Sequence, residues 1–512
     1  LLTEPLQKFI YMKTTLFIAC QFFALMLVAQ TPCGNNTANG FPCDKLDLMS
    51  QISPAQMSAS FANDSWGWTD PMDGKEYALV GLNNGTAFID ISDPVNPIYL
   101  GKLPTHTSSS LWRDLKVYQN HVFIVSEANG HGMQVFDLTR LRNLGGPPPI
   151  TFTEDAHYPN FGNAHNIAIN EASGYAYAVG TNTFAGGPHI IDISNPVNPT
   201  PMGGYSAVGY SHDAQVITYN GPDTDYSGSE IYIGSNADEV VLLDITDKNN
   251  IQQISILSYT DIGYTHQGWF TEDLKYFLLG DESDELNVGF NTRTIVFDFT
   301  DLDNPTQFFE YFGPTQAIDH NGYVVGDLYY VANYTAGMRI VDISDIENQN
   351  INEVAYFDTY LPNDQASFDG TWNVYPFFES GNIVMSGDAG FTLVQANEEL
   401  GVQQTVPQNF ELLPNPASNF VKVRSNKGPV TSVSIHNVLG QKVMSEQFTP
   451  SLSQNINVGN LKAGMYLVTI NEKTTIIKEC RKIVSRSLFL CTSVSRYCKP
   501  AIKPNLRQRT IA

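Results

Sequence analysis

Four of the ten histidines in this 512-residue chain recur at nearly constant spacing. They are His165, His212, His266 and His320, and the intervals between them are 47, 54 and 54 residues. Neutral imidazole is a frequent ligand of transition metals, and a nearby carboxylate can act as a further ligand or orient the ring. The pattern predicts a site to which each of several repeated units contributes one side chain.

The same position of the repeat holds Arg113 one unit earlier, and Ser65 and Gly370 near the ends of the series. The following position holds Asp114 and Asp213, and in the other units Trp66, Asn166, Gln267, Asn321 and Thr371. Three interpretations remain open. The histidines bind a transition metal with Asp114 or Asp213 beside it, or they form a polar pocket in which Arg113 binds an anionic group. In the third, each histidine bonds a backbone carbonyl of a neighbouring unit.

Motifs for nucleophilic catalysis are absent from the sequence between residues 30 and 397. This segment contains no H-E-x-x-H, no G-x-S-x-G and no C-x-x-C. Nucleophilic catalysis therefore has no motif to support it, and the structural bond to a neighbouring carbonyl is the favoured interpretation of the histidine position. A metal-assisted hydrolase or lyase that uses the four histidines is the alternative, and no catalytic residue is assigned.

Two acidic segments could hold Ca²⁺, which takes oxygen ligands. Asp223, Asp225 and Ser227 are spaced like the start of a calcium-binding loop, but Gly234 stands where an EF-hand has its bidentate glutamate. The second segment is GDESDE at 280–285. A solvated turn is the alternative for both segments.

The elements that must position these residues form a repeat with a period near 50 residues. A short apolar strand ending in aspartate recurs six times, and a seventh, degenerate copy has Gln395 at that position. The six are Asp90, Asp137, Asp192, Asp244, Asp298 and Asp342. Aromatic strands precede the copies and Pro/Asn turns follow most of them, so each unit has about four strands. Seven such units predict an all-β fold, a seven-bladed β-propeller whose innermost strands line a central channel.

Two further features are expected to be structural. The repeated aspartate precedes a turn, and its side chain is expected to accept hydrogen bonds from that turn. One aspartate in each blade could not converge on a substrate. Trp66 and Trp68 are expected to pack between blades, and stacking on a sugar ring is the alternative.

Long stretches of the repeat resemble a known family. They are the Ile-Val-Asp-Ile-Ser strands, YTHQGWFTED at 264–273, DHNGYVVGDLYYVANYTAGMRIVDISD at 319–345 and the early PC…PCDKLDLMS segment. These are similar to LVIVD-repeat propellers, especially to the exported set called the choice-of-anchor B family. The resemblance covers about residues 32–397. It implies a propeller and an exported location, and it implies no enzymatic activity.

Residues 1–29 contain the plan of a secretory signal peptide. Lys13 follows Met12, an apolar run covers 16–28, and Ala29 precedes Gln30. The run is shorter than the roughly 20 residues of a membrane-spanning helix. Residues 1–11 are interpreted as upstream translation. Export into an oxidising compartment favours a disulfide, Cys33–Cys43.

A different pattern begins after Asn397. Residues 398–405 are a polar linker, and alternating apolar residues with tight turns over 406–478 predict a small β-sandwich. This module resembles the type A sorting domain of type IX secretion substrates, through Pro414, Asn415, Pro416, Gly440, Gly464 and Tyr466. The resemblance implies the type IX secretion machinery as a partner and removal of the module after export. A permanent carbohydrate-binding sandwich is the alternative.

The charge distribution argues against a nucleic-acid partner. The net charge is −24, and because residues 478–512 contribute +8, the rest of the chain carries −32. Nucleic acid and anionic membranes bind clustered Lys and Arg. The basic tail at 479–512, with its three cysteines, is expected to be disordered or an artefact.

The favoured function is a binding scaffold, secreted or on the outer surface of a Gram-negative bacterium. Its ligand would be a polysaccharide, a peptide or a surface protein. No transmembrane anchor is expected in the mature chain, because no segment after the signal is long and apolar enough.

Overall fold

The computed structural model describes residues 30–397, 410–413, 420–425, 429–437, 442–459, 461, 465–471 and 489–491. The chain divides into two compact units, residues 1–402 and 403–512. The expected signal peptide and linker, and Pro414, Asn415, Pro416, Gly440 and Gly464 of the sorting motif, lie outside the described residues. Among the helices of the described ranges, none is long and apolar enough to cross a bilayer.

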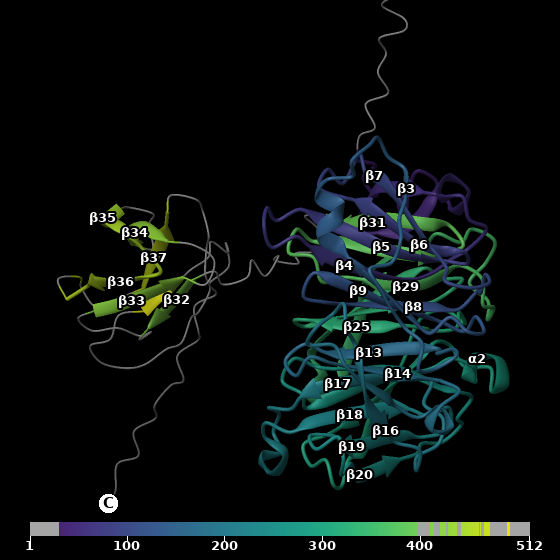
Figure 1. Ribbon diagram of the computed structural model, residues 1–512. Helices are drawn as coiled ribbons and strands as arrows, with labels where there is room; N and C mark the ends of the chain where they lie inside the picture. The colour runs from purple at the N-terminus through teal and green to yellow at the C-terminus, as the bar shows by residue number, and fades with distance from the viewer. Residues whose placement is uncertain are drawn as a thin grey trace, which may run out of the picture. The chain divides into compact units, whose positions relative to one another are not determined.

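The first unit is built from seven sheets of mostly consecutive strands, which are antiparallel except for the parallel pair of β11 with β7 (Figure 1). The first blade contains β4 (Ala62–Thr69), β5 (Glu76–Leu82), β6 (Gly85–Asp90) and β7 (Ile98–Pro104). The second contains β8 (Arg113–Tyr118), β9 (His121–Ser126), β10 (Met133–Asp137) and β12 (Ala156–Tyr158). The third contains β13 (Asn166–Asn170), β14 (Tyr175–Val179), β15 (His189–Asp192) and β16 (Thr200–Gly204). The fourth contains β17 (Asp213–Thr218), β18 (Glu230–Ser235), β19 (Val240–Asp244) and β20 (Gln252–Leu257).

The remaining blades follow the same plan. The fifth contains β21 (Thr265–Phe270), β22 (Tyr276–Asp281), β23 (Arg293–Asp298) and β24 (Thr306–Phe312). The sixth contains β25 (Gly322–Val325), β26 (Leu328–Ala332), β27 (Met338–Asp345) and β28 (Asn350–Phe357). The seventh contains β29 (Thr371–Tyr375), β30 (Asn382–Gly387), β31 (Gly390–Ala396) and β3 (Leu46–Ile52).

Short elements decorate the blades. β1 (Thr37–Ala38) and β2 (Phe41–Asp44) extend the sixth blade, and β11 (Ile150–Thr151) extends the first. The helical turns are η1 (Pro54–Met57), η2 (Leu138–Arg142), η3 (Phe184–Gly186), η4 (Thr224–Tyr226), α2 (Asp284–Asn287) and η5 (Ile346–Asn348). The seven-bladed propeller expected from the repeat is confirmed.

The ring closes because its last blade takes a strand from the beginning of the chain. β3 pairs with β31 in antiparallel register, and in Figure 1 the purple β3 runs beside the green β31. Innermost strands of adjacent blades contact one another all the way round, from β4 and β8 to β29 and β4. Closure removes the free sheet edges that an open array of blades would expose.

The repeated aspartates form turns, as the sequence pattern predicts. A side-chain oxygen of each of the six accepts a hydrogen bond from the backbone N–H two residues later, at 2.8–2.9 Å. These Asx turns redirect the chain after the third strand of six blades. The aspartates therefore shape the blades.

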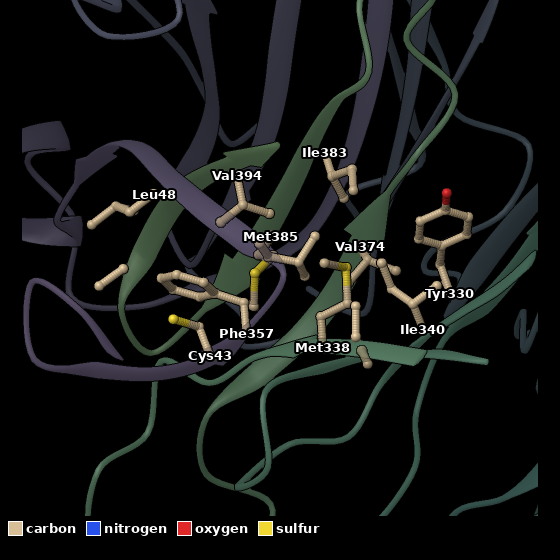
Figure 2. Close-up of a cluster of buried hydrophobic side chains, with 14 of the residues drawn as sticks. Cys43, Leu48, Tyr330, Met338, Ile340, Phe357, Val374, Ile383, Met385 and Val394 are labelled. Carbon is tan, nitrogen blue, oxygen red and sulfur yellow. The ribbon is translucent and has the colours of Figure 1, made fainter. Parts of the chain in front are cut away.

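Apolar side chains fill the space between neighbouring blades. One such cluster joins the sixth and seventh blades, where Met338, Phe357, Val374 and Met385 gather with other side chains (Figure 2). Side chains alternate between the two faces of each sheet, and each face is covered by one of the two neighbouring blades. This explains the apolar runs in the middle strands.

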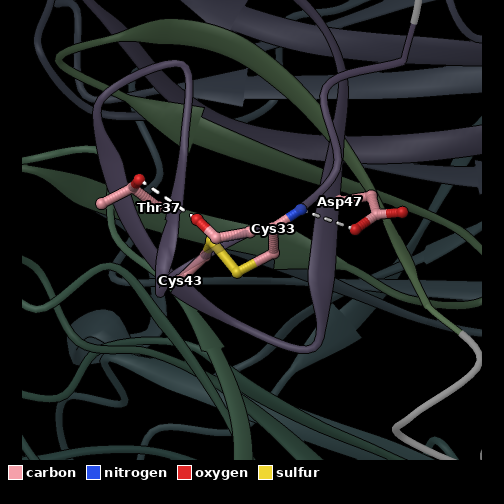
Figure 3. The surroundings of a disulfide bond; sticks show 5 residues. Cys33, Thr37, Cys43 and Asp47 are labelled. Carbon is pink, nitrogen blue, oxygen red and sulfur yellow. Dashed lines mark hydrogen bonds between the residues drawn. A yellow bond between two sulfur atoms is a disulfide. The ribbon is translucent and has the colours of Figure 1, made fainter.

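A disulfide joins Cys33 to Cys43 near the start of the first unit (Figure 3). The backbone N–H of Cys33 donates to Asp47 in β3 at 2.8 Å, and Cys43 lies in β2. The bridge therefore ties the strand that closes the ring to the hairpin that extends the sixth blade.

The second unit contains two small sheets. One consists of β32 (Phe410–Leu413), β33 (Phe420–Ser425) and β36 (Ser453–Asn457), and the other of β34 (Val430–Asn437), β35 (Lys442–Ser451), β37 (Met465–Ile470) and β38 (Phe489–Cys491). Both contribute to one buried cluster that includes Val421, Val433 and Ile435. Tyr466 of the sorting motif lies in β37. β38 belongs to the tail expected to be disordered, and at these three residues the structure differs, because they pair in parallel with β37.

Candidate functional site

The four histidines stand side by side at one end of the central channel. His165, His212 and His320 come just before the innermost strands β13, β17 and β25, and His266 lies in β21. Their ring centroids are 4.0, 4.4 and 4.3 Å apart from one blade to the next. The repeat thus brings together four imidazoles that are 155 residues apart from first to last in the sequence.

Two of these rings are oriented by the backbone of the next blade. His212 Nδ1 lies 3.3 Å from the carbonyl oxygen of His266, and His320 Nδ1 lies 2.6 Å from the carbonyl oxygen of Trp372. A carbonyl oxygen can only accept, so Nδ1 carries the proton in each neutral ring and Nε2 keeps its lone pair. The expected bond between a histidine and a neighbouring blade is therefore present, and it leaves Nε2 available.

A carboxylate orients the third ring. His165 Nδ1 lies 2.6 Å from Oε1 of Glu127, which follows β9 in the second blade. The arrangement resembles the carboxylate–histidine pairs that orient metal-binding imidazoles. Here too Nε2 is left as the free nitrogen.

His266 and His320 share a carboxylate from the fifth blade. Glu282 Oε2 lies 3.7 Å from Nε2 of His266, and Oε1 lies 3.5 Å from Nε2 of His320. The hydroxyl of Tyr334 donates to Oε1 at 2.8 Å. Both ring nitrogens of His266 are buried and have no hydrogen-bond partner among the described residues. The three side chains offer ligand atoms that all lie within 4.8 Å of one another.

Glu282 was not assigned to this site from the sequence, where it is part of the acidic segment 280–285. The missing signal is the register of the blade. Asp281, the last residue of β22, pairs with Thr265, the first residue of β21, so the next residue lies at the channel mouth beside His266. Counting forward from His266 through one hairpin would have placed Glu282.

Burial keeps the rings of His212, His266 and His320 neutral. It lowers the pKa of His212 and His266 well below the usual value and the pKa of His320 to about 3, and other ring histidines add to each shift. Burial also raises the pKa of Glu282 to about 7. Metal binding requires unprotonated imidazole, which is the form this environment stabilises.

A small cavity lies beside His165, His266 and His320, and Glu282 and His212 are not among its lining residues. Its volume is about 10 Å³, which is room for about one water molecule or one ion. It is lined by Asp64, Trp112, Arg113, His165, Asn166, His266, His320 and Trp372. A sugar or a peptide does not fit inside, so a larger ligand would have to lie over the mouth.

In the seventh blade, the residue at the histidine position lies two residues later than the repeat pattern predicts. The repeat pattern puts Gly370 there, but in the structure the backbone carbonyl of Trp372 accepts the hydrogen bond from His320. The register between β29 and β30 shifts between Thr371 and Asn373, and a similar irregularity occurs in β21 beside His266. An extra residue in a strand re-aims side chains next to it, which spacing alone does not reveal.

Arg113 is held by its own surroundings. Its Nε donates to the carbonyl of Leu82 at 3.0 Å, Nη2 donates to Thr105 at 2.7 Å, and Nη1 lies 3.0 Å from Nε2 of His131. Burial lowers the pKa of Arg113 to about 10. Each guanidinium nitrogen of Arg113 therefore has a partner within the protein.

Asp114 and Asp213 belong to a separate ionic cluster. Asp114 forms an ion pair of 2.6 Å with Lys116 and accepts a hydrogen bond from the backbone N–H of Ile167 at 2.8 Å. Asp213 accepts from the N–H of Ala214 at 2.6 Å, and burial raises its pKa to about 6. The structure gives Asp114 partners of its own, and Glu282 takes the position beside the histidines.

The first acidic segment does not fold as a calcium loop. Asp223 accepts a hydrogen bond from the N–H of Asp225 and so begins η4. Its carboxylate lies close to those of Asp301 and Asp303, which are exposed, and these three carboxylates could hold a cation. The segment itself forms a turn on the surface.

Trp68 packs as expected. It is buried and stacked on Tyr77. Trp66 is half-buried and meets Tyr323, Tyr375 and Phe377 of the sixth and seventh blades. Both tryptophans thus serve packing inside the propeller.

Comparison with known families agrees with this architecture. The LVIVD repeat family matches residues 75–105, 161–207 and 323–355. The secretion system C-terminal sorting domain family matches residues 411–486. The chain is thus an all-β propeller protein with LVIVD repeats and a C-terminal sorting domain. The sorting domain implies interaction with the type IX secretion machinery and export to the cell surface or the extracellular space.

Two solved structures match the chain at low similarity. Hydrazine synthase of Kuenenia stuttgartiensis is 11% identical, with a TM-score of 0.46, over 64% of this chain and 94% of that chain. A protein from Lactobacillus plantarum is also 11% identical, with a TM-score of 0.41, over 77% of this chain and 98% of that chain. No curated protein matches the sequence.

Proposed function

We propose that this chain is an exported binding scaffold. Its binding site would contain a transition-metal ion held at the channel mouth by His266, Glu282 and His320. The observation that carries the proposal is the pair of buried, unpartnered nitrogens of His266 beside a shared carboxylate. A signal peptide that begins at Met12 and ends at Ala29, and membership of the choice-of-anchor B set, are parts of the same proposal.

The spacing of the three side chains supports an ion of zinc-like size. Metal–nitrogen and metal–oxygen bonds of about 2.0–2.1 Å in a tetrahedron put ligand atoms about 3.3 Å apart. Glu282 reaches His266 with Oε2 at 3.7 Å and His320 with Oε1 at 3.5 Å, and one ligand atom of each residue lies within 4.8 Å of the others, so the side chains would have to draw closer to complete the set. Three protein ligands leave a fourth position open to the channel mouth, which is where an external ligand would bind.

The loops around the mouth offer a surface for a larger ligand. Trp112, Tyr210 and Phe368 stand just before the innermost strands β8, β17 and β29, and their exposed fractions are 41, 39 and 50%. Exposed aromatic rings close to a polar site suit recognition of a polysaccharide, a peptide or a surface protein. The ion would then anchor one polar group of that ligand.

Metal analysis of the full chain tests the proposal. We expect about one zinc, copper or iron ion per chain after purification or after loading and desalting, measured by plasma mass spectrometry. His266→Ala and Glu282→Gln should each lower the retained metal at least about tenfold, in line with the loss of a ligand.

A matched control comes from a histidine–glutamate pair elsewhere in the chain. His106 lies 3.0 Å from Glu154 outside the channel, so His106→Ala should retain the metal. Metal content that stays near zero in the wild-type chain would overturn the proposal and leave the histidines a structural role.

A metal-assisted hydrolase or lyase is the second candidate. It is favoured by Glu282, whose pKa of about 7 suits a general base at neutral pH. In this alternative Glu282 would take a proton from a water molecule and would not be a metal ligand. Turnover of nitrophenyl esters or phosphates that is lost in Glu282→Gln, while metal content is kept, would support the enzyme.

A further inference from the structure

Exposed apolar side chains concentrate at the end of the channel where the histidines lie. Each blade presents two loops there, one that leads into its innermost strand and one that joins its second and third strands. Seven of the twelve large apolar side chains that are exposed in the described propeller belong to these loops, and Leu111, Trp112, Leu286, Leu361 and Phe368 are among them. Such a concentration on one face indicates an interaction surface, because single exposed apolar residues are normally scattered.

The same loops lack basic residues. Within the described chain they contain no Lys or Arg, whereas the loops at the opposite end hold Lys75, Arg140, Arg142, Lys248 and Lys275. Four basic side chains reach the histidine end from strands, and each of them is bonded within the protein. They are Lys102, Arg113, Arg293 and Arg339. Exposed carboxylates of these loops, such as those of Asp238 and Asp261, therefore favour a cationic partner.

One loop combines the apolar and the acidic features. Residues 358–370 join β28 to β29 without a helix or strand, and this loop is longer than the other loops that lead into innermost strands. Irregular loops of this length are uncommon in compact domains and often functional. Leu361 and Phe368 on this loop are 61% and 50% exposed.

Aromatic rings connect this loop to the channel mouth. The ring of Phe368 meets that of Tyr334 edge-on, with centroids 5.6 Å apart, and Tyr334 in turn lies 6.0 Å from Trp372. Trp372 and Trp112 line the small cavity beside the histidines. The exposed surface of the loop is therefore continuous with the mouth.

Two carboxylates without a cation stand beside Phe368. Asp369 is the next residue, and Asp388 accepts a hydrogen bond from the backbone N–H of Gly370 at 2.9 Å. Both are exposed, and neither forms an ion pair within the described part of the chain. Arg339, which reaches this loop, pairs with Glu353 and Asp364. A Lys or Arg side chain placed here would gain contact with an aromatic ring and an ion pair at the same time.

The apolar residues favour a protein partner over a sugar. Leu111, Leu286 and Leu361 present aliphatic surface, whose burial against apolar side chains of a partner is favourable. A sugar would press its hydroxyl groups against this surface and leave some of them without hydrogen bonds.

We propose that the loops at the histidine end bind a cationic, partly apolar segment of another protein. A Lys or Arg side chain of that segment lies between Phe368 and the carboxylates of Asp369 and Asp388, and its apolar residues cover the exposed leucines. The inference rests on the scaffold part of the proposed function, because it names the partner of that scaffold, but it does not require the metal ion.

Fluorescence anisotropy with the full chain tests the inference. The probe is a fluorescein-labelled peptide of about ten residues in which Lys and Leu alternate. We expect saturable binding of one peptide per chain, which weakens at least about tenfold between about 50 and 500 mM salt because salt screens exposed charges. Peptides with Glu in place of Lys, or Ser in place of Leu, should bind much more weakly. A chitosan oligosaccharide that binds as tightly as the Lys/Leu peptide would overturn the choice of a protein partner.

Variants at the two ends of the channel locate the surface. Phe368→Ala and Asp369→Asn should each weaken peptide binding at least about fivefold, as loss of an important interface residue does, without a change in thermal unfolding. Met72→Ala and Asp303→Asn are the matched controls, because Met72 and Asp303 are exposed on loops at the opposite end. Equal losses in the controls, or wild-type binding in Phe368→Ala and Asp369→Asn, would overturn the inference.

The metal site and the peptide surface can fail separately. A wild-type chain that retains zinc, copper or iron but does not bind the peptide would overturn the peptide surface alone. Peptide binding with the expected losses in Phe368→Ala and Asp369→Asn, in a chain that retains no metal, would support the surface and overturn the metal site.

Discussion

Burying a ring nitrogen without a hydrogen-bond partner costs about 1–3 kcal/mol, and His266 buries two of them. His212 and His320 avoid part of this cost, because their Nδ1 atoms face carbonyl oxygens of the next blade. A metal ion at Nε2 would offset the cost at His266. Binding of the metal ion should therefore change the energy of the folded protein most at His266.

Asp358, away from the histidine site, allows a test of how burial affects a single carboxyl group. Burial raises its pKa from 3.8 to about 7, so the folded chain holds a proton that the unfolded chain releases above about pH 4. Its contribution to stability is present below that pH and is lost as pH rises through about 7. In Asp358→Asn this loss is absent, and the amide oxygen of the variant should still accept the hydrogen bond from the N–H of Tyr360.

The measurement is urea unfolding of both proteins between pH 4 and 8. The stability of the wild type relative to Asp358→Asn should fall by roughly 4 kcal/mol at most over this range. Parallel profiles for the two proteins would contradict the prediction.

At the scale of the element, six blades share the turn after their third strand, whereas the pairing at the start of the innermost strand differs between blades. Six aspartates make the same Asx turn after the third strand, so the turn is a property of the repeat. Irregular pairing near the start of β4, β21 and β29 is a property of individual blades. These bulges let the same strand present a histidine, a tryptophan or an aspartate to the cavity.

Asp192 allows a test of the turn in the third blade. Asp192→Ala removes the acceptor for the N–H of Ser194, which lies 2.9 Å away, and should lower the free energy of unfolding by about 1 kcal/mol. Asp192→Asn keeps an acceptor oxygen and should change it much less. Urea unfolding at neutral pH measures both, and equal losses in the two variants would show that charge, not the turn, matters.

At the scale of the whole molecule, stability depends on closing the ring. β3 comes from the beginning of the unit and completes the blade made by the last three strands. It also carries Leu48, Met49 and Ile52 into the clusters between blades. The disulfide near its start keeps this strand beside the sixth blade.

Removing residues 30–52 should therefore open the ring. The edge of β31 and the apolar faces beside it would become exposed, and we expect aggregation, seen as loss of the monomer peak in size-exclusion chromatography and as dye binding. The control is a chain that ends at residue 402, because the first unit has its own core. That control should remain monomeric and unfold cooperatively, and a soluble monomer after deletion of 30–52 would contradict the role of β3.

Much of the fold could be predicted from the sequence because a propeller repeats local information. A strand ending in Asp192 or Asp244 needs only its own turn to be recognised, and seven copies imply radial closure. The spacing of His165, His212, His266 and His320 likewise placed them in one register. Cys33 and Cys43 could be paired because few cysteines were available in that segment.

The rest of the site depended on contacts between distant residues. Glu282 reaches His266 across one hairpin of the fifth blade and His320 in the sixth blade, so the shared contact depends on how the two blades pack. A bulge in β29 puts Trp372 at the histidine position in place of Gly370. The side chain of Arg113 bonds the carbonyl of Leu82, a contact that the repeat spacing does not reveal. By itself the sequence determined the blades, their number and the sorting domain, since these follow from local turns, alternation and repetition. The tertiary structure alone decided which nitrogens and oxygens are left buried without partners, because burial and pairing exist only once the blades are packed.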